Sequence, residues 1–211
     1  MQAKLISLAI GYIFGCFLTA DVVANKYAGK SASEIGGTGN PGMANVMAQL
    51  GFVPGIITLA GDLAKCLLAG LWCYFLFHET GMIVVLYAGL GCTLGHDFPA
   101  WKHYKGGKGV ATTSMTVVMY SFLAGVVANI VGLLVVLATK YLCIGGPFIP
   151  LTFAVLMFVK GDIEAGIIGV ILTVLSVIKH SGSIRGIKSG ATSKTDVIAA
   201  LKKKSAAKDE K

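Results

Sequence analysis

The sequence predicts an all-α protein, a polytopic membrane helical bundle of about seven transmembrane helices with its N-terminus outside. The first observation is composition: 55% of the 211 residues are hydrophobic and only 13% are charged, whereas a soluble domain carries roughly 25% charged residues. The second is the mean hydropathy of +0.77, with the apolar residues gathered in long runs. The third is an uneven distribution of the net charge of +8. A soluble enzyme, a disordered protein and a disulfide scaffold are therefore disfavoured.

The first half of the chain contains three apolar segments that we expect to span a membrane. A bilayer core requires about 20 apolar residues per helix, with a range of roughly 17–25. Residues 5–20 form the first expected span, residues 50–77 the second, and residues 82–94 a third that is short but rich in Val and Leu. Residues 25–45 are polar and rich in glycine, and they are too hydrophilic to span.

The second half begins with a polar, basic loop and continues with further apolar segments. The loop comprises residues 96–108. Residues 110–137 are apolar throughout and too long for one untilted span, so they predict either one long helix or two short ones. Residues 142–159 form another expected span, broken near its start at residues 145–147, and residues 163–178 form the last.

The domain organisation expected from these segments is simple. Residues 1–180 form a single transmembrane domain, and residues 181–211 form a basic cytoplasmic C-terminal tail whose helix frays after Thr195. The five cysteines lie in or beside apolar stretches without metal-ligand spacing, which indicates buried free thiols. The sequence predicts neither a metal site nor a cofactor.

The basic residues predict the orientation of the bundle. With seven spans and an external N-terminus, both polar loops and the tail lie on the cytoplasmic side, together with 15 of the 18 Lys and Arg residues. Six spans would place the tail opposite the two loops and fit the charge distribution less well. The positive net charge therefore reflects the positive-inside rule rather than binding of nucleic acid. The expected location is a multi-pass position in a cell membrane.

The first polar loop has the composition of an anion-binding loop. Residues 36–42 contain four glycines, and Asn40-Pro41-Gly42 is a turn signal. Successive backbone N–H groups in such a loop form a concave nest that binds anions. The alternative is an ordinary flexible loop between two helices.

The second polar loop combines two ammonium groups with glycine. Lys105, Gly106, Gly107, Lys108 and Gly109 directly precede the helix expected from residue 110. A helix N-terminus supplies free N–H groups and a positive dipole end, which together favour a bound phosphate. The spacing is not that of a Walker A loop. The alternative is a set of positive-inside lysines at the start of a helix.

Four further side chains are candidates for chemistry. Asp62 and Lys65 lie i, i+3 on one helix inside an apolar span, where an isolated charge costs about 2.5–3.5 kcal/mol. They either neutralise each other and hold helices together, or Asp62 positions Lys65 toward a substrate phosphate. His96 is a proton-transfer group or a structural loop histidine. His180 follows the last span and is expected on the same side as both loops.

Three segments in this order resemble the bacterial acyl-phosphate:glycerol-3-phosphate acyltransferase family: GTGNPGMAN (37–45), GDLAK (61–65) and the loop at 94–112. The resemblance covers the whole chain. It implies a seven-helix integral membrane enzyme of phospholipid biosynthesis with its motifs on the cytoplasmic side. The implied reaction moves a fatty acyl group from long-chain acyl phosphate to the 1-hydroxyl of glycerol 3-phosphate, giving lysophosphatidic acid and phosphate.

The resemblance also assigns roles to individual residues. The expected catalytic residues are His96, Lys108 and His180, and Asp62 is expected to position Lys65. The residues expected to bind substrate or phosphate are Thr38, Gly39, Asn40, Asn45, Lys65, Lys105, Gly106, Gly107, Gly109 and Ser183. The chain departs from the family pattern at several positions. Thr38 replaces the usual serine, Ala44 a threonine and Ala48 an arginine, and Ser183 lies in a third motif that lacks the usual polar run.

Two alternatives belong to other functional classes. A small membrane transporter or binding protein for a phosphorylated metabolite would use the same basic loops and the Asp62–Lys65 pair. Transporters usually have a midplane site and internal repeats, and the sequence contains no repeat. The second alternative is a catalytically weakened relative, indicated by the altered third motif. The expected partners are glycerol 3-phosphate, long-chain acyl phosphate and membrane lipid, without nucleic acid.

Overall fold

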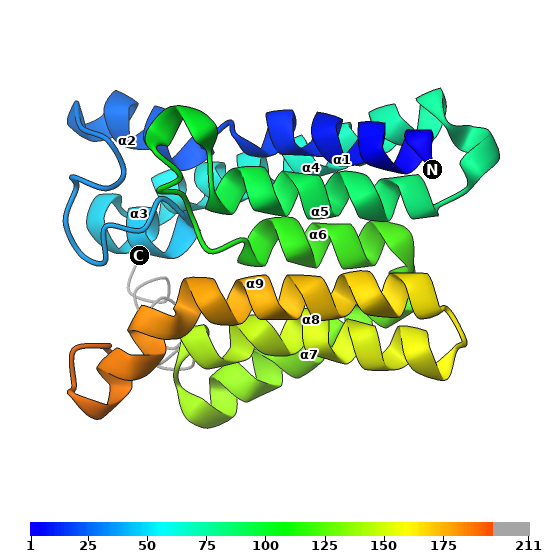
Figure 1. The fold of residues 1–211 in the computed structure, drawn as a ribbon. Helices are drawn as coiled ribbons and strands as arrows, with labels where there is room; N and C mark the ends of the chain where they lie inside the picture. Colours follow the sequence, from blue (N-terminus) through cyan, green and yellow to red (C-terminus); the bar gives the residue numbers. More distant parts are fainter. Residues whose placement is uncertain (196–211) are drawn as a thin grey trace, which may run out of the picture.

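The computed structural model describes residues 1–195, and this part of the chain folds into a bundle of helices (Figure 1). Its α-helices are α1 (Gln2–Gly15), α2 (Thr19–Ala28), α3 (Met43–Leu50), α4 (Phe52–Leu76), α5 (Ile83–Asp97), α6 (Val110–Tyr120), α7 (Phe122–Thr139), α8 (Leu142–Val159) and α9 (Ile163–Lys188). Two short 3₁₀ helices, η1 (His78–Thr80) and η2 (Ala100–Lys102), complete it. The all-α membrane bundle predicted from composition is confirmed.

Six segments of the described chain are long and apolar enough to cross a membrane, with α1 and α2 counted together. Helix α6 lies beside α5 (Figure 1) and is apolar, but it has only 11 residues, about 16 Å of helix. The count of seven spans and the external N-terminus therefore stay predictions.

Several helix boundaries differ from those expected. Residues 110–137 form two helices that meet at Ser121, as the second of the two alternatives had it. The expected break at residues 145–147 is wrong, because α8 is continuous and contains Pro147 and Pro150. Gly145 and Gly146 serve close packing instead, since a Cβ on Gly145 would overlap Val136. The first expected span is interrupted after Gly15 and resumes at Thr19.

Helices α1 and α5 pack against each other along matching glycines. Gly11 and Gly15 on α1 contact α5 backbone, and Gly91 and Gly95 on α5 contact α1 backbone, so that a Cβ on any of the four would overlap a carbonyl group of the other helix. Small residues four positions apart allow membrane helices to approach at backbone distance. This contact fixes the end of α5, from which the second polar loop emerges.

Replacing Gly91 by alanine is expected to destabilise the bundle. The added Cβ would lie against the carbonyl oxygen of Leu8, a backbone atom that cannot rotate away. Overpacking of this kind costs about 1–3 kcal/mol. Thermal unfolding in detergent should therefore show a lower Tm for Gly91→Ala. The matched control is Gly182→Ala on α9, where nothing lies within 4 Å of the new Cβ and alanine favours the helix. Equal Tm values for the two variants would contradict this packing.

The polar loops gather at one end of the bundle. The loops that follow α2 and α5 lie at the same end as the C-terminus of α9, and the N-terminus and the α8–α9 turn lie at the other (Figure 1). The backbone N–H of Thr195 donates to the carbonyl of Lys140 at 2.7 Å, which brings the α7–α8 turn to the loop end. Helix α9 continues through residue 180 to Lys188, and the expected fraying after Thr195 lies outside the described residues.

Candidate active site

A polar pocket of about 630 Å³ opens between the two loops and the last helix. It is lined by Ser33, Thr38, Gly39, Asn40, Pro41, Lys102, His103, Lys105, Gly106, Lys108, Lys179, Gly182 and Ser183. Three segments that are far apart in sequence therefore meet at one place. Of the residues predicted for the site, Thr38, Gly39, Asn40, Lys105, Gly106, Lys108 and Ser183 are brought together here.

The first loop is shaped by Asn45 from α3. The Asn45 Oδ1 atom accepts hydrogen bonds from the backbone N–H of Thr38 at 3.0 Å and from its hydroxyl at 3.2 Å, and Nδ2 donates to the carbonyl of Ala32 at 3.4 Å. Gly39 has a φ of +63°, which favours glycine at the turn. Asn45 is buried and lies behind the pocket wall, so it fixes the loop while Thr38 and Asn40 face the pocket.

The second loop folds back onto the end of α5. The backbone N–H groups of Gly106 and Gly107 donate to the carbonyls of Asp97 at 3.1 Å and His96 at 2.9 Å. A Cβ on Gly107 would overlap the His96 imidazole. Gly109, with a φ of +64°, precedes α6 directly. These contacts hold the loop so closely to α5 that its glycines have no room for side chains.

Lysine side chains dominate the electrostatics of the pocket. Lys102, Lys105, Lys108 and Lys179 all line it. Lys108 Nζ donates to the Ser183 hydroxyl at 2.6 Å, and burial lowers the pKa of Lys108 from its ordinary value. Lys179 Nζ donates to the carbonyl of Asp97 at 2.7 Å. Ammonium groups that are partly removed from water bind a phosphate more strongly than exposed ones do, because the local dielectric constant is lower.

The predicted pair Asp62 and Lys65 lies inside the bundle and not at the pocket wall. Both side chains are buried, with Lys65 Nζ 3.0 Å from Asp62 Oδ1. Lys65 Nζ also donates to the carbonyls of Gly15 at 3.2 Å and Phe17 at 2.7 Å, and it lies 2.9 Å from His96 Nδ1. The ammonium group thus donates to backbone carbonyls at the interruption between α1 and α2. It does not contact the second loop directly, and His96 lies between them.

Neither predicted histidine lines the pocket. His96 is 4% exposed and is held between Lys65 and the backbone of Gly107. His180 is 3% exposed, and its Nδ1 lies 2.8 Å from the carbonyl of Ser176. Because a carbonyl only accepts, Nδ1 of His180 carries the proton and Nε2 is directed toward Gly146. Both imidazole rings are buried outside the pocket lining, where His96 packs against Gly107 and His180 against Gly146.

Among the residues at the pocket that were not predicted as site residues, Lys102, Lys179 and Asp21 matter most for its charge and shape. Lys179 and Lys102 line it, and Asp21 links its two loops. The Asp21 carboxylate accepts from the backbone N–H of Ala32 in the first loop at 2.8 Å and forms an ion pair with Lys102 in the second loop. The available signal was an acidic residue at the end of the first span, which by itself resembles an interfacial cap. Within residues 1–195, no group of three or more His, Cys, Asp or Glu side chains is placed to hold a metal ion.

Comparison with known proteins assigns the chain to a family. A family model described as glycerol-3-phosphate acyltransferase matches residues 5–190. A Lactobacillus johnsonii protein named glycerol-3-phosphate acyltransferase 1 is 38% identical over 95% of this chain and 97% of its own. A Lactobacillus acidophilus protein of the same name is 38% identical over 99% of this chain and 100% of its own.

Solved structures share the fold. A crystal structure of PlsY (YgiH), an integral membrane glycerol 3-phosphate acyltransferase in its glycerol 3-phosphate form, superimposes with a TM-score of 0.81 at 24% identity. The match covers 94% of this chain and 98% of that one. A second structure of the same protein, in its lysophosphatidic acid form, gives a TM-score of 0.77 over 90% of this chain and 94% of that one. Sequence and fold agree, and the chain belongs to the glycerol-3-phosphate acyltransferase family.

Proposed function

We propose that this protein transfers a fatty acyl group from a long-chain acyl phosphate to the 1-hydroxyl of glycerol 3-phosphate, at the cytosolic face of a bacterial cell membrane. The observation that carries the proposal is the single pocket in which two glycine-rich loops meet four lysines. Both proposed substrates carry phosphate, so one pocket with several cations suits both. Family membership and the names of the relatives support the same acceptor.

The reaction demands little covalent chemistry from the protein. The 1-hydroxyl oxygen forms a bond to the acyl carbonyl carbon, the bond between that carbon and the phosphate oxygen breaks, and phosphate leaves with the electron pair. The hydroxyl proton passes to a phosphate oxygen. Positioning and stabilisation of developing charge supply most of the acceleration in such a step. No cofactor is required by this balance.

The proposed roles follow from where each side chain lies. Lys105 and Lys108, together with the positive N-terminal end of α6, hold one phosphate. The amides of Gly106 and Gly107 take no part, because they donate to the carbonyls of Asp97 and His96. Thr38 and Asn40 orient the second substrate across the pocket. His96 and His180 act as positioning residues, because both rings lie behind the pocket wall. Ser183 directs the Lys108 ammonium group into the site.

One assay separates this function from transport. The protein is reconstituted in proteoliposomes with palmitoyl phosphate and radiolabelled glycerol 3-phosphate, and lysophosphatidic acid, released phosphate and uptake are measured together. Palmitoyl-CoA replaces palmitoyl phosphate in a parallel series that tests the donor. Lysophosphatidic acid formed only with palmitoyl phosphate supports the proposal. Uptake without lipid product would indicate a transporter, and neither would indicate an inactive relative.

The pH dependence of the reaction is expected to report on Lys108. Burial lowers the pKa of this ammonium group, so its charge is lost at a lower pH than that of an exposed lysine. Activity should accordingly fall as the pH rises through the lowered value. Arginine stays protonated at any of these pH values, so Lys108→Arg should move the alkaline limb of the kcat/KM profile upward even where its maximum is reduced. An unmoved limb would exclude Lys108 as its source.

A further inference from the structure

His103 lies in a tight turn of the second loop whose backbone favours residues other than histidine. The backbone N–H of Lys105 donates to the carbonyl of Lys102 at 3.1 Å, and that of Tyr104 donates to the carbonyl of Pro99 at 3.0 Å. Both central residues of the turn have positive φ, +50° for His103 and +60° for Tyr104. Two positive φ angles are typical of a type I′ turn, in which asparagine and glycine are preferred.

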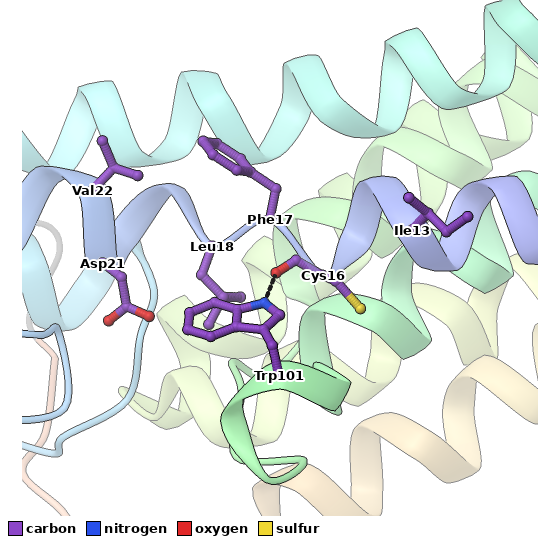
Figure 2. Close-up of a pocket in the computed structure, with 7 residues that line it drawn as sticks. All are labelled: Ile13, Cys16, Phe17, Leu18, Asp21, Val22 and Trp101. Carbon is purple, nitrogen blue, oxygen red and sulfur yellow. Dashed lines mark hydrogen bonds between the residues drawn. The ribbon is translucent and has the colours of Figure 1, made fainter.

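Contacts with α1 and α2 hold this turn in place. The Trp101 indole lies across the interruption between the two helices, and its Nε1 donates to the carbonyl of Cys16 at 2.7 Å (Figure 2). The next residue, Lys102, forms an ion pair with Asp21 of α2. Both residues belong to η2, which ends directly before His103. These contacts fix the point from which the His103 side chain extends.

The His103 side chain lines the polar pocket. Of the four histidines in the chain, all within residues 1–195, only His103 does so. Tyr104, the other residue of the turn with positive φ, is 63% exposed and is not part of the lining. The other polar side chains of the described lining are lysine ammonium groups, hydroxyls and an amide. Among these groups, an imidazole is the one suited to take up a proton and release it near neutral pH.

Glycine at position 103 would fit the turn without crowding, but it would leave the pocket without an imidazole. Residues in unfavourable backbone conformations persist where their surroundings fix them, and they cluster at functional sites. The side chain of His103, rather than its backbone, therefore accounts for a histidine at this position.

We propose that His103 relays the proton in the acyl transfer. This inference rests on the proposed function and adds to it the group that moves the proton. An imidazole nitrogen of His103 accepts the proton while the 1-hydroxyl oxygen bonds to the acyl carbon. The ring then donates a proton to an oxygen of the departing phosphate. The hydroxyl proton thus reaches phosphate, as the overall reaction requires, and the imidazole returns to its starting state.

Two glycine variants of the same turn test the relay. His103→Gly removes the imidazole, and Tyr104→Gly makes the same change at the neighbouring residue outside the pocket lining. Both should fold with a Tm close to that of the unmodified protein, because glycine adopts this backbone freely. With palmitoyl phosphate and glycerol 3-phosphate in proteoliposomes, kcat should fall about 10²-fold in His103→Gly, as expected for loss of a general acid–base group. Tyr104→Gly should keep its activity.

Free imidazole gives a measurement that a purely structural role would not affect. Added imidazole should restore part of the kcat of His103→Gly and leave that of Tyr104→Gly unchanged. His103→Asn is a second variant, since asparagine tolerates the left-handed backbone and forms hydrogen bonds but does not take up a proton. Its kcat should be as low as that of His103→Gly, with little change in KM.

The possible outcomes separate the relay from other roles and from the proposed function. Full activity of His103→Gly, or a loss that imidazole does not restore, would overturn the relay. Equal losses in both glycine variants would indicate that the rigidity of the turn matters instead, and a raised KM with unchanged kcat would indicate binding alone. Either result also overturns the relay. If the unmodified protein makes no lysophosphatidic acid from palmitoyl phosphate, the proposed function itself fails.

Discussion

Replacing Lys108 by alanine is expected to lower acyl transfer by about 10²–10³-fold, the loss that follows removal of one preorganised charge-stabilising donor. Lys108 lines the pocket from the loop that precedes α6, and its ammonium group is oriented by the Ser183 hydroxyl at 2.6 Å. In the proposed reaction the Lys108 charge neutralises the departing phosphate, and a neutral backbone donor cannot replace it. The measurement is kcat/KM for palmitoyl phosphate and glycerol 3-phosphate in proteoliposomes.

The matched control is Lys160→Ala. Lys160 also follows a membrane helix, but it lies at the α8–α9 turn, at the opposite end of the bundle from the pocket (Figure 1). It should retain full activity, which shows that loss of a lysine does not by itself impair insertion or folding. Lys108→Ala is expected to keep the Tm of the unmodified protein. Turnover by Lys108→Ala comparable to that of Lys160→Ala would remove Lys108 from the proposed site.

The sequence predicts well those helices whose own apolar run is long enough to identify them without reference to their neighbours. Runs of apolar residues located α4, α5, α8 and α9, and the distribution of lysines grouped both polar loops. The helix interruption after Gly15 was not predicted, because neighbouring elements compensate for it. The interruption after Gly15 is stabilised by Lys65 from α4 and by Trp101 from η2, which no local pattern around residue 15 can reveal.

The candidate site also contains residues that a local sequence pattern predicts and residues that depend on contacts between distant segments. Lys105, Lys108 and Gly106 are adjacent in sequence and form a recognisable pattern, so they were predicted together and lie together in the pocket. Lys179 was missed because a lysine at the end of a membrane helix is explained adequately by the positive-inside rule. The burial of both histidines also depends on tertiary packing, since His96 lies under Gly107 and His180 against Gly146. Whether such a side chain lines the pocket or is buried depends on how separate helices pack, which the sequence alone does not reveal.

Lys65 is the residue for which loss of a side chain is expected to harm stability most. In Lys65→Met, the Asp62 carboxylate stays buried without its countercharge, and the carbonyls of Gly15 and Phe17 lose their donor. Removing one partner of a buried ion pair costs about 3–5 kcal/mol. A large fall in Tm is therefore expected. In the double variant Asp62→Leu, Lys65→Met, no buried charge is left unpaired, so part of the Tm should return.

This pair of variants also decides between the two interpretations of Asp62 and Lys65. If the pair holds α1, α4 and α5 together, Tm and activity fall together in Lys65→Met and recover together in the double variant, because both losses arise from the unpaired buried charge. If Lys65 binds a substrate phosphate, activity stays low in the double variant although the Tm rises. The contacts of Lys65 Nζ with Gly15, Phe17 and His96, all away from the pocket lining, favour the first result.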